Sequence, residues 1–424
     1  MKRTTISGLL LGASASLLLA ATAQAGVTDQ DLARLAGDEW LHINGSWDGS
    51  RFSTLSQLTP ENAGQLNVKW IYSMGGEADA QASPLYHDGI IYLPQDNAVH
   101  AVSAASGSPV WKYEYELPED WGGQFVSFFT GKHRGLAIYG DNIYFQSNDC
   151  TLIALNAKSG DEVFAHKIDR PYPKDFEKST DGNGYFCTSG SMAIPGQIIV
   201  PMNATDTGGL QGYVHAHDPE TGERLWAANM IPAPGEPGAD TWPGDSRIYG
   251  GAGPWIVGTW DPELKMYFTG TANAYPWNPY SERDGAGAGN MRNEGAAAIV
   301  AVDTESGKVA WRYTVVPGDP WDYDSMQAPL LVTIDGQRTI VQPNKTGYTH
   351  YLDATTGKYL QAPQFADTIN WAKGYDSSGN PIWDHPIPPE GETVEIWPSL
   401  LGAVNMSPSA YNPNTGMFYI PRRE

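Results

Sequence analysis

The stretch Ile299-Val-Ala-Val-Asp-Thr-Glu-Ser-Gly-Lys-Val-Ala-Trp311 decides the fold of this chain, because it recurs along the sequence. Its first half alternates apolar residues, a polar turn ends at Gly307, and a second run ends at Trp311. Alternation on both sides of a glycine turn predicts a β-hairpin, in which the glycine supplies a positive φ angle. The aromatic ring at the end of each copy is then free to pack on a neighbouring unit.

Further copies of this stretch lie at residues 99–111, 152–164 and 214–226, and a looser copy lies at residues 349–360. Paired strand patterns such as residues 84–93 stand between the copies, and no long amphipathic helical pattern is present. A repeat of this kind has to be interpreted before any local motif. Four strands per unit, at spacings of about 40–60 residues, predict an all-β fold of the β-propeller type.

The repeats predict about five and a half propeller blades. Five complete blades are expected between Gln81 and Pro363, and a sixth begins between Asn405 and Pro421. A leading segment at residues 44–72 is expected to supply strands to the last blade of a closed ring. Because no last blade follows, we expect a C-terminally truncated propeller, whose open sheet edges favour aggregation.

Residues 1–25 have the pattern of a secretory signal peptide. A basic start at Lys2 and Arg3 precedes an apolar run, and Ala23-Gln-Ala25 is a small-residue cleavage site. No later apolar run is long enough to span a bilayer. The predicted organisation is therefore a signal peptide at 1–25 and one propeller domain at 26–424, exported to the periplasm.

Charge and cysteine content limit the partners. The formal net charge is −22, and it becomes −24 once residues 1–25, with Lys2 and Arg3 and no acid, are removed. Such an acidic body argues against nucleic acid or an anionic membrane, and it leaves room for a basic protein partner. Cys150 and Cys187 fit neither a zinc site nor a Cys-x-x-Cys-His haem attachment, and a disulfide between them is left open.

The stretch Pro320-Trp321-Asp322-Tyr323-Asp324 is the candidate for chemistry. On an extended backbone, Asp322 and Asp324 point to the same side, because side chains alternate. Two such carboxylates repel each other unless a cation lies between them, and the aromatic neighbours Trp321 and Tyr323 lower the local dielectric constant. Taken alone, the pentapeptide is better interpreted as an acidic surface turn, and only the rest of the chain favours a functional site.

Two further motifs precede it in the chain. Gly250-Gly-Ala-Gly-Pro-Trp255, followed by Asp261-Pro262, combines glycines that allow close backbone approach with a planar ring. Gly270-Thr-Ala-Asn273 contains an amide oxygen, which is a ligand suited to a hard cation.

Together with the repeats, these motifs resemble the quinoprotein alcohol dehydrogenases of the methanol and ethanol dehydrogenase type, over about residues 38–421. The resemblance implies an eight-bladed propeller that binds pyrroloquinoline quinone (PQQ) and a Ca²⁺ or lanthanide ion on its axis. It implies that Trp255 stacks on the quinone and that Asn273 ligates the metal. Asp322 corresponds to the general base close to the metal, and Asp324 to the additional carboxylate of lanthanide-dependent members.

The same resemblance implies roles for more residues. Arg134 and Thr188 match positions that bind the carboxylates of the quinone, Lys345 matches a cation near its reactive carbonyl, and Asn405 matches a polar contact at the same ring edge. Gln81 stands where the family often has Glu.

Two departures accompany the resemblance. Thr207 aligns with the metal-binding Glu of the family, and the neighbouring Asp206 is the candidate to replace it. Phe128-Phe129 stands in place of the adjacent cysteine pair that covers the other face of the quinone.

The function implied by the resemblance is oxidation of a small alcohol to an aldehyde, with Asp322 removing the hydroxyl proton. The resemblance also implies that electrons pass to a c-type cytochrome. Because the sequence contains no haem attachment motif, this acceptor is expected to be a separate protein or to lie in missing sequence. Two alternatives stay open at this point, namely a non-catalytic scaffold of the outer-membrane assembly type and an inactive truncated paralogue.

Overall fold

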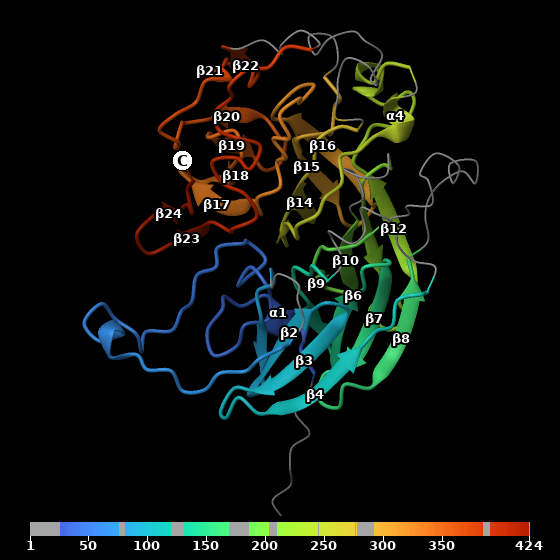
Figure 1. The fold of residues 1–424 in the computed structure, drawn as a ribbon, viewed down its shortest axis with the longest axis vertical. Helices are drawn as coiled ribbons and strands as arrows, with labels where there is room; N and C mark the ends of the chain where they lie inside the picture. The colour runs from blue at the N-terminus through green and yellow to red at the C-terminus, as the bar shows by residue number, and fades with distance from the viewer. Residues whose placement is uncertain are drawn as a thin grey trace, which may run out of the picture.

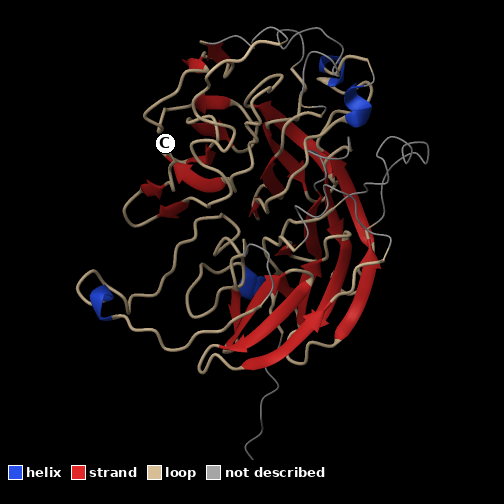
Figure 2. Cartoon of the chain, in the orientation of Figure 1, coloured by secondary structure: helices blue, strands red, loops and turns tan. Residues whose placement is uncertain are grey.

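A computed structural model of the chain describes residues 26–75, 81–119, 131–168, 186–202, 210–244, 246–275, 277, 292–384 and 391–423. Nearly all of its regular structure is β-strand (Figure 2). The described helices are single turns: α1 (Asp29–Leu32), η1 (Ala63–Gln65), η3 (Ala239–Thr241) and α4 (Ser246–Tyr249).

Five four-stranded antiparallel sheets form the body of the protein, and each takes four consecutive strands in chain order. Figure 1 shows them following one another around a common centre. The strands of the first three sheets are β1 (Leu85–His87), β2 (Ile90–Gln95), β3 (Ala98–Ser103), β4 (Pro109–Glu114), β5 (Ala137–Tyr139), β6 (Asn142–Gln146), β7 (Thr151–Asn156), β8 (Glu162–Lys167), β9 (Met192–Ile194), β10 (Gln197–Met202), β11 (Tyr213–His217) and β12 (Arg224–Asn229). The strands of the last two are β13 (Thr259–Asp261), β14 (Met266–Gly270), β15 (Ala298–Asp303), β16 (Lys308–Thr314), β17 (Leu330–Ile334), β18 (Gln337–Pro343), β19 (Thr349–Asp353) and β20 (Tyr359–Gln361). The five predicted blades and the all-β propeller fold are confirmed.

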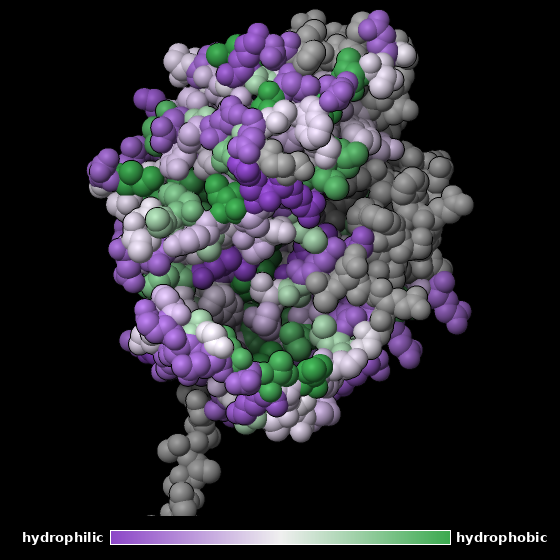
Figure 3. All heavy atoms as spheres, turned by 60° about the vertical axis from the view of Figure 1, so that its left-hand side comes forward, coloured by the Kyte–Doolittle hydropathy of each residue, from purple (hydrophilic) through white to green (hydrophobic). Residues whose placement is uncertain are grey.

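Two further sheets contain only two strands each. The hairpin of β23 (Ala410–Asn412) and β24 (Met417–Tyr419) lies in the region where the sequence predicts a sixth blade. The hairpin of β21 (Ala372–Tyr375) and β22 (Pro381–Trp383) was not predicted. Figure 3 shows the side of the molecule that carries the β23–β24 hairpin, where the surface is hollowed and hydrophobic residues gather in the recess.

The register between the third and fourth strands shifts at the same place in all five sheets, for example between Ala101 and Val102 and between Ala301 and Val302. Such a bulge adds local twist to the strand that carries it. In the first two sheets the third strand is almost entirely buried and the fourth alternates between exposed and half-buried. The chain in each blade therefore runs outward, and the turns before the first strands lie toward the centre.

The aromatic residue on each fourth strand packs against the turn glycine of the next blade. An ideal Cβ on Gly160 would lie 2.6 Å from the ring of Trp111, and one on Gly357 would lie 2.5 Å from the ring of Trp311. The indole of Trp111 also donates to the carbonyl of Ala157 at 2.9 Å. The predicted docking of each aromatic ring on its neighbour is confirmed.

The leading segment takes part in the same pattern. Trp70 packs against Gly107, and its indole donates to the carbonyl of Ala104 at 3.0 Å. Residues 66–75 nevertheless form no strand, and Val68 and Ile71 are 78% and 85% exposed. Trp70 thus occupies the place of an outer-strand aromatic ahead of the first blade.

Cys150 and Cys187 form a disulfide, with Cα atoms 5.1 Å apart, which resolves the pairing that the sequence left open. In the part of the chain that the structure describes, no helix is long and apolar enough to cross a membrane. The predicted signal peptide at 1–25 lies outside the described residues.

Candidate active site

The backbone around Asp322 is not extended, so the geometry assumed for the carboxylate pair was wrong. Asp322 has a φ angle of 60°, in the left-handed region that Asp tolerates better than most residues. The buried carboxylate of Asp319 holds this turn, because it accepts from the backbone amides of Trp321 at 2.9 Å and Tyr323 at 2.7 Å. The segment is a tight loop fixed by a third carboxylate that the sequence reasoning missed.

The side chains of Asp322 and Asp324 still converge, and the cation between them is Lys345. Its Nζ lies 3.4 Å from Asp322 Oδ1 and 3.4 Å from Asp324 Oδ2, and it donates to the Asp322 carbonyl at 2.8 Å. An ammonium group at this distance offsets the repulsion between two carboxylates in a site of low dielectric constant. Lys345 is therefore the local counter-charge of the pair.

A loop near the C-terminus covers the stem of Lys345. An ideal Cβ on Gly402 would lie 2.5 Å from Lys345 Cβ, and the amide of Ala403 donates to the Lys345 carbonyl at 3.0 Å. The lysine side chain is consequently only 4% exposed. Gly402 has a φ of +74° in a loop without a strand pattern, so no signal in the sequence marked it as part of the site.

The two carboxylates differ in access to solvent. The side chain of Asp322 is 24% exposed, whereas that of Asp324 is 4% exposed. A general base has to come within hydrogen-bond distance of the proton that it removes. Of the pair, Asp322 is the carboxylate that a substrate can reach.

Asp324 instead joins three predicted site residues from distant parts of the chain. Its Oδ1 accepts from the backbone amide of Asn273 at 2.7 Å, and its Oδ2 accepts from the indole Nε1 of Trp255 at 3.1 Å. Together with Lys345, these contacts bring four of the predicted site residues into one cluster.

Gly251, in the motif before Trp255, and Gly212 allow backbone segments to pack closely. A Cβ on Gly251 would lie 2.5 Å from the carbonyl oxygen of Asn273, and a Cβ on Gly212 would lie 2.2 Å from that of Ala252. These glycines let three backbone segments pack against one another, with Gly212 donating to Gly251 at 2.8 Å. The close approach thus places Trp255 beside Asn273.

Arg134 and Thr188 also meet, as the resemblance implied. Arg134 Nη1 donates to the hydroxyl of Thr188 and, at 3.3 Å, to its carbonyl, and the guanidinium carbon lies 4.6 Å from the centre of the Trp255 ring. Such a contact is a cation–π interaction. The Arg134–Thr188 pair therefore adjoins the tryptophan.

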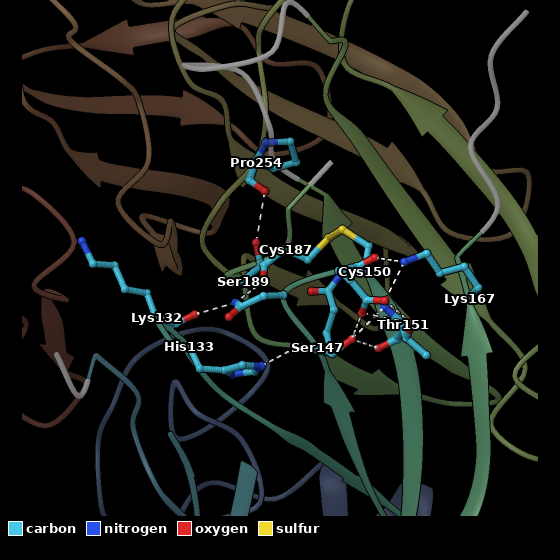
Figure 4. The surroundings of a disulfide bond; sticks show 12 residues. Lys132, His133, Ser147, Cys150, Thr151, Lys167, Cys187, Ser189 and Pro254 are labelled. Atoms are coloured by element: carbon cyan, nitrogen blue, oxygen red, sulfur yellow. Dashed lines mark hydrogen bonds and ion pairs between the residues drawn. A yellow bond between two sulfur atoms is a disulfide. The ribbon is translucent and has the colours of Figure 1, made fainter. Parts of the chain in front are cut away.

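Thr188 directly follows the disulfide, which Figure 4 shows together with its surroundings. The side chain of Asn148 donates to the Cys187 carbonyl at 2.9 Å and to the Lys132 carbonyl at 3.2 Å. Ser189 donates to the Pro254 carbonyl at 3.2 Å. These bonds hold the segment at Thr188, which precedes β9, between the loop that carries Arg134 and the loop that carries Trp255.

Two buried oxygens of predicted site residues have no hydrogen-bond partner among the described residues, namely Asn273 Oδ1 and Gln81 Oε1. A buried polar atom of this kind normally has a partner. Asn273 is 3% exposed, its backbone amide contacts Asp324, and a side-chain amide oxygen suits a hard cation. The residues present therefore fit a bound metal ion at this point.

The remaining predicted residues are less directly placed. Asp206, Thr207 and the pair Phe128-Phe129 lie outside the described residues. Within the described ranges, no group of three or more His, Cys, Asp or Glu side chains could hold a metal ion. Of the residues predicted to ligate a metal, Asp322, Asp324 and Asn273 lie within the described ranges.

Asn405 uses its side chain within its own loop. Its Nδ2 donates to the Leu401 carbonyl at 2.9 Å, and its Oδ1 accepts from the Met406 amide at 2.8 Å. The amide caps the loop that covers Lys345, and its contact with a cofactor stays a prediction.

Burial has an electrostatic effect on Asp319. It raises the pKa of this carboxyl to about 6, the nearby Asp324 charge adds to the rise, and the amides of Trp321 and Tyr323 oppose it.

The fold and this cluster define the class: a β-propeller with a carboxylate–lysine site between its blades. The chain belongs to the PQQ family described as glucose/ethanol/alcohol dehydrogenase, β-propeller domain, whose model matches residues 40–362.

Individual relatives agree with this assignment. The chain is 32% identical over 443 residues to quinohemoprotein alcohol dehydrogenase ADH IIB of Pseudomonas putida, covering 100% of this chain and 61% of that protein. It is 31% identical over 442 residues to quinoprotein alcohol dehydrogenase PedH of Pseudomonas putida, covering 96% of this chain and 70% of that protein. Among solved structures, a europium-containing methanol dehydrogenase superposes with a TM-score of 0.77 at 26% identity, over 91% of this chain and 68% of that one.

Proposed function

We propose that this protein is a PQQ-dependent alcohol dehydrogenase that oxidises a small alcohol to an aldehyde. The observation that carries the proposal is the convergence of Asp322, Asp324 and Lys345 near Asn273, whose backbone amide contacts Asp324 and whose side-chain oxygen has no hydrogen-bond partner among the described residues. A non-catalytic scaffold has no need for a buried ion cluster of this kind, because desolvating charges is costly.

Asp322 is proposed as the general base. Oxidation of an alcohol removes one proton from the hydroxyl group and one hydride from the carbon. The carboxylate of Asp322 is partly exposed and would accept the proton, and the ammonium group of Lys345 lies 3.4 Å from it. Asp319 keeps the base in place by fixing the turn on both sides of it.

PQQ, when bound, would supply the two-electron acceptor for the hydride, and the metal ion would supply Lewis acidity. Trp255 offers a flat surface for the quinone, and Arg134 with Thr188 offers donors for its carboxylates. Lys345, Asn405 and Gln81 are proposed as further polar contacts. The cationic side chains suit a cofactor that carries carboxylates.

The metal is proposed to be Ca²⁺ or a lanthanide ion. Asn273 Oδ1, Asp322 and Asp324 would ligate it, with Asp206 as the candidate for one more carboxylate. Such oxygen ligands are those that hard cations prefer.

A c-type cytochrome is proposed as the electron acceptor, in the periplasm after export through the signal peptide at 1–25. The chain has only two cysteines, and they are bonded to each other, so a covalently held haem would belong to another polypeptide or to sequence beyond these residues. The acidic charge of the protein favours a basic partner surface. One relative named above carries haem in its name.

The test is reconstitution of the purified 424-residue protein with PQQ and either Ca²⁺ or La³⁺, followed by dye reduction with a panel of primary alcohols. We expect reduction that depends on PQQ, on metal and on alcohol together. Binding of PQQ without turnover would indicate the inactive paralogue, and failure to bind PQQ would contradict the proposal.

A further inference from the structure

Asp324 makes hydrogen bonds to the protein that a role as metal ligand alone does not require. An ionised carboxylate has about four lone-pair sites for donors or cations. In Asp324 three donors from the protein already approach it: the Asn273 amide at 2.7 Å, the Trp255 indole at 3.1 Å and Lys345 Nζ at 3.4 Å. The side chain is 4% exposed, so water does not compete strongly for these sites.

The contact with Trp255 decides how the indole ring is oriented. An indole has a single hydrogen-bond donor, so its acceptor fixes which edge of the ring points into the site. The acceptor here is charged and buried, and charge-assisted hydrogen bonds are stronger than neutral ones. Arg134 contacts the same ring from a face, 4.6 Å from its centre. Asp324 therefore holds the edge of the Trp255 ring, and Arg134 contacts its face.

We propose that Asp324 is a positioning residue for Trp255: its carboxylate fixes the plane of the indole ring that receives the quinone, whether or not a metal ion is bound. The role in quinone binding rests on the proposed function, whereas the hydrogen bond itself does not. Asp324 acts through the tryptophan, and the backbone amide of Asn273 and Lys345 hold the carboxylate in turn.

A nuclear magnetic resonance measurement tests the hydrogen bond in protein without cofactor or metal. With ¹⁵N-labelled tryptophan, Trp255→Phe identifies the indole signal of Trp255 among those of the 15 tryptophans. We expect Asp324→Ala to shift this signal and to speed its hydrogen exchange, because the acceptor is lost. The remaining indole signals report whether the fold is kept.

Asp322→Asn is the matched control, since Asp322 contacts the same lysine at the same 3.4 Å but is not the acceptor of the indole. It is expected to leave the Trp255 signal in place. Asp324→Asn keeps the shape of the side chain and is the second variant if Asp324→Ala does not fold. An indole signal that neither Asp324 substitution moves would overturn the proposal.

A double-mutant cycle tests the consequence for the quinone. PQQ is titrated in EDTA into the wild type, Asp324→Ala, Trp255→Phe and the double variant. We expect Asp324→Ala to weaken PQQ binding by about tenfold when Trp255 is present, on the order of one charge-assisted hydrogen bond, and less than about twofold in the Trp255→Phe background.

Equal losses in both backgrounds, or no loss without metal, would show that Asp324 does not act through Trp255. Failure of the wild type to bind PQQ at all would count against the proposed function, while the indole signal would still decide whether Asp324 positions the tryptophan.

Discussion

At the scale of single residues, the balance of charge in the site depends on Lys345. Two carboxylates and one ammonium group within 3.4 Å leave the cluster with one net negative charge, and little of it is exposed. Removing one partner of a buried ion cluster is strongly destabilising, because the remaining charge stays buried without its counter-charge. A metal ion bound between Asn273, Asp322 and Asp324 would add to this compensation.

The choice between Ca²⁺ and a lanthanide ion is expected to depend on Asp324. Asp324 adds a carboxylate that favours a trivalent ion, while Thr207 stands where the family has a Glu. We expect activity with La³⁺ to exceed activity with Ca²⁺, with weak retention of either ion, since two carboxylates and one amide are few ligands for a cation that takes about 6–8 oxygens. The measurement is a titration of metal-free protein with Ca²⁺ and La³⁺.

The control for the metal prediction is Asp324→Ala. Through Trp255 this substitution lowers activity with both ions, but the loss of a ligand should lower the ratio of La³⁺ to Ca²⁺ activity as well. A Ca²⁺ activity equal to that with La³⁺, with a ratio unchanged in Asp324→Ala, would refute the assignment of Asp324 as a ligand.

At the scale of elements, the docking of an aromatic ring on a turn glycine connects each blade to the next. We expect Gly160→Ala to destabilise the protein by about 1–3 kcal/mol through overpacking against Trp111, in addition to the cost of a positive φ angle. Gly196→Ala is the matched control: its φ of +70° resembles the +76° of Gly160, but nothing lies within 4 Å of its Cβ. Denaturant unfolding measures both, and equal losses would show that the ring contact contributes nothing.

The disulfide between Cys150 and Cys187 is expected to stabilise the folded protein. It closes a loop over a sequence separation of 37 residues, and the chain-entropy estimate for such a loop is about 3–4 kcal/mol. We expect the double variant Cys150→Ser and Cys187→Ser to lose about this much stability and to bind PQQ more weakly, because Thr188 follows Cys187.

Reductant provides the control for the disulfide. It should lower the unfolding midpoint of the wild type toward that of the variant and leave the variant unchanged. A wild-type midpoint that does not respond to full reduction would contradict the predicted stabilisation.

The blades could be predicted from sequence because their determinants are local. An alternating strand, a turn glycine and an aromatic residue, as in residues 299–311, occur within thirteen positions of one another. The β21–β22 hairpin was missed for the same reason, since its strands are only four and three residues long and do not repeat the pattern.

The sequence predicted which residues would meet, but not how they meet. The motifs named Trp255, Asn273, Asp322 and Asp324, and the structure brings them together. Their geometry depends on side chains that meet only in three dimensions, so the left-handed turn at Asp322 had no sequence signal.

The same limit applies to the supporting residues. Asp319 acts on the turn through backbone amides that the sequence cannot place. Gly402 reaches Lys345 only because the chain folds back over it. Both contacts therefore became visible only in three dimensions.

At the scale of the whole molecule, buried histidines distributed over the fold make stability sensitive to acid. Burial lowers the pKa of His42 and His133 to about 4 and that of His350 to about 3, and it holds the pKa of His215 well below 6.5. Between pH 6.5 and 4 the unfolded chain binds protons at these histidines that the folded protein does not bind. Each of these histidines therefore lowers the free energy of unfolding by up to about 1.4 kcal/mol for every unit by which the pH falls.

Asp319 acts in the opposite direction. Its raised pKa of about 6 means that the folded protein takes up this proton first, so the contribution of Asp319 to stability is gained as the pH falls from about 6 to 4. Four histidines outweigh one carboxyl group. We expect Tm to fall from pH 6.5 to pH 4, more gently in His350→Gln, and a Tm that is constant or rises over this interval would contradict the prediction.

Whether Asp322 is the base of a PQQ-dependent alcohol oxidation is tested by the turnover of Asp322→Asn after reconstitution with PQQ and metal. PQQ binding is followed in the same samples by its absorbance. We predict a loss of turnover of about 10²–10⁴-fold relative to the wild type, with a much smaller change in PQQ affinity. Turnover by Asp322→Asn close to that of the wild type would contradict this role of Asp322.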